Sequence, residues 1–441
     1  MTTMRWLAKG AGAAALAAVV LLACGMAWAE EQAPGGTPPA GFSAIFNGKD
    51  LTGWKGLMGN PKTRAAMTPE QLAEAQQKAD AVMAQHWRAE GNEIVNDGGG
   101  PHLCTAKKYG DFEMWVDWKI APKGDSGVYL RGSPQVQIWD PVNGIDQAKV
   151  GSGGLYNNQK NPSKPLVLAD RPAGQWNTFY IRMIGERVTV KLNGQLVVDN
   201  VPLENYWDRS RPIYPAEQIE LQTHGGETRF RNVYLREIPA EEANAFLLNL
   251  GGEGFEPIFN GKDLADWQGS VDGYIVENGS LICDPKKGGT LLTKKEYADF
   301  SVRFEFRLPP GGNNGLALRT PAEGNPAYVG MEIQILDDTA DKHKDLQSYQ
   351  YHGSIYGTVA AHRGYTRPVG EWNYEEVICK GTRVTIKVNG TTTVDADLSK
   401  IEKTPDGQEH PGLKRATGRI GFMGHGDRVE LRNIRVKTLA P

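Results

Sequence analysis

The sequence contains little cysteine. Only four cysteines occur among its 441 residues, and no two of them stand in a C-x-x-C spacing. That scarcity excludes a cysteine-based zinc knuckle and a disulfide-rich scaffold. Cys24 belongs to the N-terminal segment, and the other three cannot all pair within the chain. We therefore expect Cys104, Cys283 and Cys379 to be buried thiols.

The sequence also lacks an excess of basic residues. Lys and Arg together number 49 against 52 Asp and Glu, which gives a formal net charge of -3. This balance argues against a nucleic acid or an anionic membrane as the partner, and favours a small or neutral ligand. Glycine (53 residues), proline (26) and tryptophan (11) are plentiful, which is typical of an all-β protein with many turns.

The N-terminal apolar run, Ala11–Ala23, is rather short for a permanent membrane helix, which needs about 20 apolar residues. The run Ala11–Ala23 follows Arg5 and Lys9 and precedes Ala27-Trp28-Ala29, so residues 1–29 resemble a signal peptide. The alternative is a lipobox at Leu21–Cys24, which would leave a lipid anchor on Cys24 as in bacterial lipoproteins. Either interpretation predicts a secreted or periplasmic protein of bacterial type, with no membrane span.

The chain contains two copies of one domain. The phrase at 42–54, FSAIFNGKDLTGW, returns at 255–267 as FEPIFNGKDLADW, and five further phrases return in the same order. Such self-similarity indicates a duplication. We place the two domains at 41–238 and 255–438, with linkers at 30–40 and 239–254. The other repeated phrases are 109–112 with 297–300, 126–131 with 314–319, 174–177 with 370–373, 187–194 with 383–390, and 230–234 with 431–435.

Within each copy, apolar and polar residues alternate over runs such as 112–120 and 300–308, as in half-buried antiparallel strands. Asn193-Gly194 and Asn389-Gly390 are tight hairpin signals. Each copy should therefore be a meander or jelly-roll sandwich. The first copy has an insertion at 56–85, in which Thr68-Pro-Glu-Gln71 predicts the start of a helix. That helix either closes a site or, as we favour, covers a sheet edge.

The segment 328–338, YVGMEIQILDD, carries the densest set of candidate functional residues. In a strand, Glu332 and Gln334 would share one face, while Met331, Ile333 and Ile335 would take the other. Asp337 is out of phase and reaches the same face only through a bulge or the end of the strand. The equivalent segment 133–140 keeps a polar pair as Gln135 and Gln137, and it keeps Asp140. An amide can bind a hydroxyl group but cannot take a proton.

A histidine recurs at one place in both copies, as His224 and His425, beside glycines that let a ligand approach. We interpret it as an acid/base group or a metal ligand, the alternative being a histidine that caps a turn. Arg319 could clamp a substrate oxygen or pair with Asp337. The remaining candidates for substrate binding are Arg131, Tyr156, His352 and Tyr356, and we expect His343, His362 and His410 to be solvated in loops.

With these phrases in view, both copies resemble the 3-keto-disaccharide hydrolase domain family. The repeated Phe-Asn-Gly-Lys-Asp-Leu start, the Gly-x-Trp-Asn phrase and the closing Arg-Asn carry the resemblance, which covers nearly all of 42–438. It implies a concanavalin A-like jelly roll and activity on sugars oxidised at carbon 3. A ketone there acidifies the proton on carbon 2, so that a base, an enolate stabiliser and an acid suffice for β-elimination and subsequent hydration.

The resemblance thus predicts an enzyme that cleaves 3-keto-glycosides or 3-keto-disaccharides. We expect Glu332, Asp337, His425 and Arg319 to be catalytic. A divalent metal such as Mn²⁺ or Ca²⁺ could bind Glu332, Asp337 and His425, and we expect no organic cofactor. Two alternatives remain open. One is a non-catalytic carbohydrate-binding pair of domains, and the other is a conventional retaining glycosidase with two carboxylates about 5 Å apart.

Overall fold

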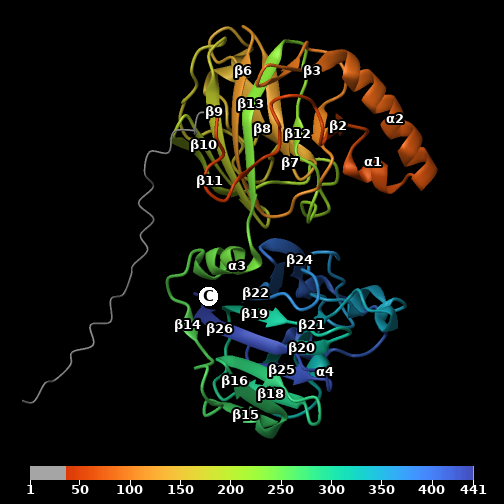
Figure 1. Cartoon of the computed structure of the whole chain (residues 1–441). Helices are drawn as coiled ribbons and strands as arrows, with labels where there is room; N and C mark the ends of the chain where they lie inside the picture. Colours follow the sequence, from red (N-terminus) through yellow and green to blue (C-terminus); the bar gives the residue numbers. More distant parts are fainter. Residues whose placement is uncertain (1–35, 441) are drawn as a thin grey trace, which may run out of the picture. The chain divides into compact units, whose positions relative to one another are not determined.

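The computed structural model describes residues 36–440, so the predicted signal peptide and Cys24 lie outside the described residues. Within 36–440, two β-sandwiches follow one another along the chain (Figure 1). Each consists of one eight-stranded and one five-stranded antiparallel sheet, with similar strand order in the two copies. The prediction of an all-β protein with two tandem sandwiches is confirmed. None of the described helices is long and apolar enough to cross a membrane.

The first sandwich contains strands β1 to β13. Its eight-stranded sheet has the order β11-β10-β9-β6-β13-β4-β3, with β1 beside β13, and its five-stranded sheet has the order β2-β5-β12-β7-β8. The strands are β1 Ser43–Ala44, β2 Trp54–Gly56, β3 Trp87–Glu90, β4 Glu93–Asn96, β5 Leu103–Thr105, β6 Phe112–Ile120, β7 Asp125–Leu130, β8 Ser133–Trp139, β9 Asn177–Ile184, β10 Arg187–Leu192, β11 Gln195–Pro202, β12 Glu220–Leu221 and β13 Thr228–Glu237, with the 3₁₀-helix η1 at Asp146–Val150.

The second sandwich contains β14 to β26. Its eight-stranded sheet has the order β16-β17-β26-β19-β22-β23-β24, with β14 beside β26, and its five-stranded sheet has the order β15-β18-β25-β20-β21. The strands are β14 Glu256–Pro257, β15 Trp267–Gly269, β16 Tyr274–Glu277, β17 Ser280–Cys283, β18 Gly289–Thr293, β19 Phe300–Arg307, β20 Asn313–Thr320, β21 Met331–Leu336, β22 Asn373–Lys380, β23 Arg383–Val388, β24 Thr391–Asp397, β25 Arg419–Gly424 and β26 Glu430–Thr438.

The helices are few, and all of them except α2 (Pro69–His86) have ten residues or fewer. The α-helices are α1 Pro61–Ala65, α2 Pro69–His86, α3 Ala240–Asn249 in the predicted linker and α4 Pro326–Val329, and the remaining 3₁₀-helices are η2 Val271–Gly273, η3 Asp341–His343, η4 Ser348–Gln350, η5 Leu398–Lys400 and η6 Pro411–Lys414. Most of the chain outside the sheets is therefore loop, and these loops supply part of the pocket described below.

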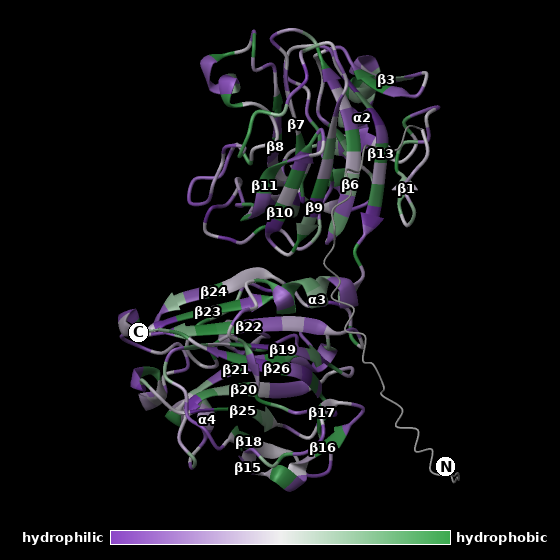
Figure 2. Cartoon of the chain, turned by 90° about the vertical axis from the view of Figure 1, so that its left-hand side faces the viewer, coloured by the Kyte–Doolittle hydropathy of each residue, from purple (hydrophilic) through white to green (hydrophobic). Residues whose placement is uncertain are grey.

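Alternation along the strands builds both cores. Hydrophobic and hydrophilic segments alternate along β6 and β9 (Figure 2), as the period of two residues requires. In β21, Met331, Ile333 and Ile335 belong to the core of the second sandwich, as predicted. The Asn-Gly pairs form tight turns, because Asn193 and Asn389 have φ of 49° and 48° before glycines that also have positive φ. Cys104, Cys283 and Cys379 are buried free thiols, which confirms that expectation.

The inserted helix lies against an edge strand. α2 begins with the predicted capping box, in which Thr68 and Gln71 exchange side-chain and backbone hydrogen bonds. Strand β2 is the last strand of its five-stranded sheet, and α2 packs on it (Figure 1). The amide of Gly56 in β2 donates to Asp80, and its carbonyl accepts from Gln76. The helix thus satisfies backbone groups that an edge strand leaves unpaired, which is the function we favoured from the sequence.

Two of the repeated phrases contact each other in each copy: the Ser/Asn-Gly-x-x-Leu-Arg phrase (126–131 and 314–319) and the Tyr-x-Asp-Phe phrase (109–112 and 297–300). Arg319 is almost fully buried, and it donates to Asp299 and to the carbonyls of Ala298 and Gly381. Arg131 donates in the same way to Asp111 and Gly110. Both arginines have positive φ, which few residues other than glycine adopt: Arg131 lies in the turn between β7 and β8, and Arg319 lies near the end of β20, where the pairing with β25 is irregular. A buried guanidinium with several acceptors therefore links the end of one sheet to a strand of the other in each copy.

This arrangement predicts that Arg319→Ala destabilises the protein by about 3–5 kcal/mol, since the change leaves the carbonyls of Ala298 and Gly381 without their donor and the partly buried carboxylate of Asp299 without its ion pair. Urea unfolding followed by tryptophan fluorescence measures the effect. The control is Arg428→Ala, which removes an exposed ion pair with Glu277 and should cost less than about 1 kcal/mol. Equal losses for the two variants would contradict the structural role of Arg319.

Candidate functional site

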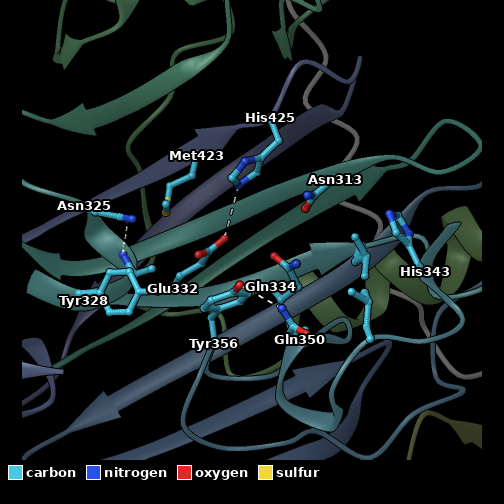
Figure 3. Close-up of a pocket in the computed structure, with 13 residues that line it drawn as sticks. Asn313, Asn325, Tyr328, Glu332, Gln334, His343, Gln350, Tyr356, Met423 and His425 are labelled. Carbon is cyan, nitrogen blue, oxygen red and sulfur yellow. Dashed lines mark hydrogen bonds and ion pairs between the residues drawn. The ribbon is translucent and has the colours of Figure 1, made fainter. Parts of the chain in front are cut away.

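A pocket of about 350 Å³ lies on the outer face of the five-stranded sheet in the second sandwich. Strand β21 supplies its floor, β20 and β25 supply further side chains, and α4 and the loop that follows β21 supply its walls (Figure 3). The lining residues are Asn313, Asn325, Ala327, Tyr328, Glu332, Gln334, Leu336, His343, Leu346, Gln350, Tyr356, Met423 and His425. The structure therefore brings four predicted site residues together, namely Glu332, Gln334, Tyr356 and His425.

Glu332 and His425 face each other in this pocket (Figure 3). Oε1 of Glu332 lies 3.7 Å from Nε2 of His425, and the side chain of Glu332 is only 5% exposed whereas that of His425 is 41% exposed. In the orientation that satisfies its surroundings, the amide nitrogen of Gln334 donates to Glu332 at 3.2 Å and to the carbonyl of Asn314 at 3.0 Å. A nearly buried carboxylate is thus held by an amide and paired with an imidazole that solvent or a ligand can reach.

A glycine on the neighbouring strand makes room for this carboxylate. Gly315 in β20 lies opposite Gln334 in the register, and a Cβ atom at Gly315 would come within 2.2 Å of Oε1 of Glu332. In the first sandwich, Gly127 lies opposite Gln137, and a Cβ there would come within 2.9 Å of Nε2 of Gln135. The glycine of the repeated Ser/Asn-Gly phrase is therefore required by close approach of a polar side chain.

Two tyrosines form the aromatic part of the pocket wall. The hydroxyl of Tyr356 accepts a hydrogen bond from Gln350 at 3.1 Å, and its backbone amide donates to the carbonyl of Glu332. Tyr328 in α4 packs against His410, with ring centroids 4.9 Å apart. Asn325 caps α4 by accepting from the amide of Ala327. Aromatic faces beside hydrogen-bonding groups are the usual composition of sites that bind neutral polar ligands.

The structure does not place Asp337 or Arg319 in the pocket, which corrects the expectation that they act there. Asp337 is buried at the end of β21, where its carboxylate accepts from Gly311 and from the amide and hydroxyl of Thr339. Burial opposes ionisation of Asp337, but these hydrogen bonds outweigh it and hold its pKa below the usual value. Arg319 is occupied by Asp299 and three carbonyl groups. Arg319 and Asp337 therefore do not form the ion pair that was the alternative.

Three histidines occupy places that the sequence did not indicate. His352 is buried, and its Nδ1 accepts from the amide of Leu336. We expected His352 to bind substrate, but its burial keeps it from a ligand in the pocket. Burial lowers the pKa of His352 to about 3, which keeps the ring neutral. His343 and His410 are buried rather than solvated, and His343 lines the pocket with Nδ1 at 2.9 Å from the carbonyl of Asp337.

The outer face of the first sandwich keeps the polar pair but uses it differently. Gln135 donates to Gln137 at 2.6 Å and to Gln222 at 3.0 Å, and both glutamines are buried. Asp140 caps a turn by accepting from the amides of Lys123, Val142 and Asn143, so the expectation that it binds substrate is not met. Arg131 is likewise occupied by Asp111 and a carbonyl, away from this face. His224 lies with Nδ1 at 3.6 Å from Asp125, and its side chain is 63% exposed.

A buried carboxylate on this face escaped the sequence reasoning. Glu220 in β12 is 1% exposed, and its Oε2 has no hydrogen-bond partner among the described residues. Burial raises the pKa of Glu220 to about 8, while Arg64 opposes that change and Glu217 adds to it. The signal was present in the alternation of Glu220, Gln222 and His224, which places all three on one strand face.

The predicted metal set is not assembled. Over residues 36–440, no three side chains of His, Cys, Asp or Glu come together as a metal-binding group, because Asp337 caps a turn instead of joining Glu332 and His425. A smaller set remains in the pocket. Oδ1 of Asn313 is buried without a hydrogen-bond partner, and Asn313 lines the pocket with Glu332 and His425 (Figure 3). A carboxylate, an imidazole and an amide oxygen can hold a divalent cation with positions left for a ligand.

The fold and the site together define a β-sandwich protein with a carboxylate–imidazole pair in an aromatic pocket. Both copies match the model of the 3-keto-alpha-glucoside-1,2-lyase-like domain, over residues 41–236 and 254–437. Because the two matches cover most of the sequence, the chain belongs to this family.

Three similar proteins each match a little under half of this chain. The chain is 27% identical over 250 residues to a 3-keto-disaccharide hydrolase of Bacteroides thetaiotaomicron, a match that covers 47% of this chain and 86% of that protein. It is similar to a candidate glycosyl hydrolase from Parabacteroides distasonis, with 28% identity, a TM-score of 0.39, and coverage of 42% of this chain and 99% of that one. A Bacillus subtilis protein with a galectin-like fold is 14% identical, with a TM-score of 0.30 and coverage of 42% and 94%.

The environment of Glu220 predicts how stability depends on pH. A carboxyl group whose pKa rises from about 4.3 in the unfolded chain to about 8 in the fold binds a proton more tightly when folded. Its contribution to stability is complete below pH 4 and is lost as the pH rises to 8, by at most about 1.4 kcal/mol per pH unit. Glu220→Gln keeps the group neutral at every pH. The free energy of unfolding of the variant should therefore rise relative to that of the wild type between pH 5 and pH 8.

Urea unfolding at pH 5, 6, 7 and 8 tests this expectation. The control is Glu237→Gln, which changes an exposed carboxylate of the same sandwich and should follow the wild type at every pH. Parallel curves for the wild type and Glu220→Gln would show that Glu220 does not hold a proton in the folded protein.

Proposed function

We propose that the protein is an enzyme that cleaves 3-keto-glycosides or 3-keto-disaccharides by elimination and hydration, and that the pocket of the second sandwich is its active site. The observation that carries the proposal is the pair of Glu332 and His425, 3.7 Å apart in an aromatic pocket. The family of the chain and its similarity to a 3-keto-disaccharide hydrolase support a keto sugar as the substrate class.

Glu332 is the base in this mechanism. Its carboxylate takes the proton from carbon 2, which the neighbouring ketone makes acidic, and the electrons of that C–H bond form the enolate. Gln334 fixes the carboxylate by donating to Oε1, the same oxygen that faces His425. A base of this kind contributes about 10²–10⁴-fold to the rate of proton transfer.

His425 is the acid. As the bond between carbon 1 and the glycosidic oxygen breaks, the imidazolium donates its proton to the leaving oxygen, and a carbon 1–carbon 2 double bond forms. Water then adds, with its oxygen bonding to carbon 1, one proton passing to His425 and the proton on Glu332 returning to carbon 2. The sum is hydrolysis with both groups restored. The exposure of His425 lets it reach a leaving group at the pocket mouth.

Asn313 and one carboxylate oxygen of Glu332 would hold a divalent cation that would stabilise the enolate oxygen by its charge, while His425 keeps the proton that it donates. The pocket offers Asn313, with an amide oxygen that has no other partner, for such a cation. The proton transfers above are made by the two side chains themselves, so the cation would add only to the stability of the enolate.

A conventional retaining glycosidase is less well supported. That chemistry needs two carboxylates about 5 Å apart across the scissile bond. The predicted second carboxylate was Asp337, whose oxygens are hydrogen-bonded to Gly311 and Thr339 at the end of the strand. The carboxylate that lines the pocket is Glu332, and its partner there is an imidazole.

The first test is Glu332→Gln. We expect aglycone release from a 3-keto-glucoside to fall by at least about 100-fold, because glutamine cannot accept the proton. Calorimetry should give an unchanged Kd for the unoxidised parent glycoside, since the amide fills the same space. The matched control is Glu323→Gln, which changes an exposed carboxylate of the same sandwich. Full activity in Glu332→Gln, or release from the unoxidised parent at the same rate, would reject the mechanism.

The second test concerns the cation. We expect EDTA to lower release from the keto substrate at least about tenfold and Mn²⁺ to restore it, because an unneutralised enolate is a poorer intermediate. Calorimetric titration with Mn²⁺ gives a readout independent of activity, in which Asn313→Ala and Glu332→Gln should each weaken binding. Undiminished activity in EDTA together with no Mn²⁺ binding would assign stabilisation of the enolate to the protein alone.

A further inference from the structure

The first sandwich repeats the histidine–carboxylate pair with the carboxylate on a different strand. Gly127 and Gly315 occupy equivalent places in the register, so Asp125 in β7 corresponds to Asn313 in β20. At the place of Glu332, the first sandwich has Gln135. One copy thus has Glu and Asn where the other has Gln and Asp, and each has one carboxylate at this site.

The distances in the two pairs are closely similar. His224 Nδ1 lies 3.6 Å from Asp125 Oδ2, and His425 Nε2 lies 3.7 Å from Glu332 Oε1. An amide holds the carboxylate in both copies, because Nε2 of Gln137 donates to Asp125 at 2.8 Å just as Gln334 donates to Glu332. The amide of Gln137 is itself fixed by the carbonyls of Ser126 and Ile138. The pair therefore sits in a built polar network rather than in a chance surface contact.

A pocket of about 400 Å³ adjoins this network through Gln137. Trp139 and Tyr156 stand edge to face in its wall, with ring centroids 5.2 Å apart. Trp139 is fixed by a hydrogen bond from its indole to the carbonyl of Gly151, whereas Tyr156 is 46% exposed. Asp146, Gln147, Ser163 and Lys164 add polar groups of both charges to the lining. Aromatic walls with a mixed polar rim fit a neutral sugar.

We propose that the first sandwich holds a second acid–base site, in which His224 exchanges a proton with a keto sugar bound against Trp139 and Tyr156 and Asp125 positions the imidazole. The proposal rests on the proposed function for its substrate class. Nδ1 of His224 faces Asp125, which leaves Nε2 for the ligand. Burial raises the pKa of Asp125 and His224 opposes that change, as a partly buried carboxylate beside an imidazole requires.

The step balances without any further reagent. Nε2 of His224 takes the proton from the carbon next to the ketone, and the electrons of that C–H bond form the enolate. The imidazolium then exchanges its proton with solvent and returns one to the same carbon. In D₂O the net change is the replacement of one carbon-bound hydrogen by deuterium. His224 is thus the catalytic residue, and Asp125 is a positioning residue.

The experiment uses the full chain in the Glu332→Gln background, so that the second sandwich cannot act as the base. NMR follows hydrogen–deuterium exchange at carbon 2 of a 3-keto-glucoside in D₂O, with the rate in buffer alone subtracted. We expect Glu332→Gln to retain protein-dependent exchange and the added change His224→Asn to lower it at least about 100-fold. His86→Asn, which alters another His–Asp pair of the first sandwich, is the matched control and should leave exchange unchanged.

Two further variants separate positioning from binding. Asp125→Asn installs the residue that the second sandwich has at this place, so it should lower the exchange rate about tenfold or more while the Kd for the unoxidised parent glycoside stays the same. Tyr156→Ala should raise that Kd instead. An effect of Asp125→Asn on the melting temperature with no effect on exchange would reduce Asp125 to a structural role and overturn the proposal.

The two proposals fail in different ways. No exchange above buffer in Glu332→Gln, or exchange that survives His224→Asn, overturns the second site even when the wild type releases aglycone. Exchange that depends on His224 in a protein that releases no aglycone supports the second site and overturns the proposed function.

Discussion

The five-stranded sheets depend on one constraint, which is that polar side chains on their outer face must be buried and hydrogen-bonded at the same time. An unpaired buried polar group costs about 1–3 kcal/mol, so each such residue needs a partner within reach. In the second sandwich Gln334 serves Glu332, and in the first Gln137 serves both Gln135 and Asp125. Gly315 and Gly127 supply the space, because any larger residue would collide with these side chains. The amide network therefore determines where a carboxylate can stand.

This constraint explains how the two copies could diverge without losing the site. Moving the carboxylate from β21 to the equivalent of β20 leaves it beside the same histidine and the same glutamine. Glu332 and Asn313 in one copy correspond to Gln135 and Asp125 in the other, so each copy has a carboxylate beside this histidine, but on a different strand. The register permits this, because Glu332 and Asn313 lie two residues to either side of the pair formed by Gly315 and Gln334, so that a carboxylate at either place can reach the same amide.

The sequence predicted the fold well because the fold rests on local, periodic signals. Alternation, Asn-Gly turns and the repeated phrases all reported on strands and hairpins, and the capping box at Thr68 identified α2. The polar face of β21 followed from the same period. Residues at strand ends were harder, because their direction is decided by the turn. Asp337 and Asp140 became turn caps, and Arg319 and Arg131 turned into the protein to meet Asp299 and Asp111.

Residues that act across strands could not be found by considering one strand at a time. Asp125 begins β7, and nothing in its own segment marks it as the partner of His224, which lies about a hundred positions away in the sequence. When segment 133–140 is taken alone, the first copy has no carboxylate at the place of Glu332, and an amide pair cannot move a proton. The pairing of β7 with β12 and of β7 with β8 brings histidine, carboxylate and glutamine together. An acid–base site in a sheet is a property of neighbouring strands, so its loss can be inferred only when every strand that shares the face has been considered.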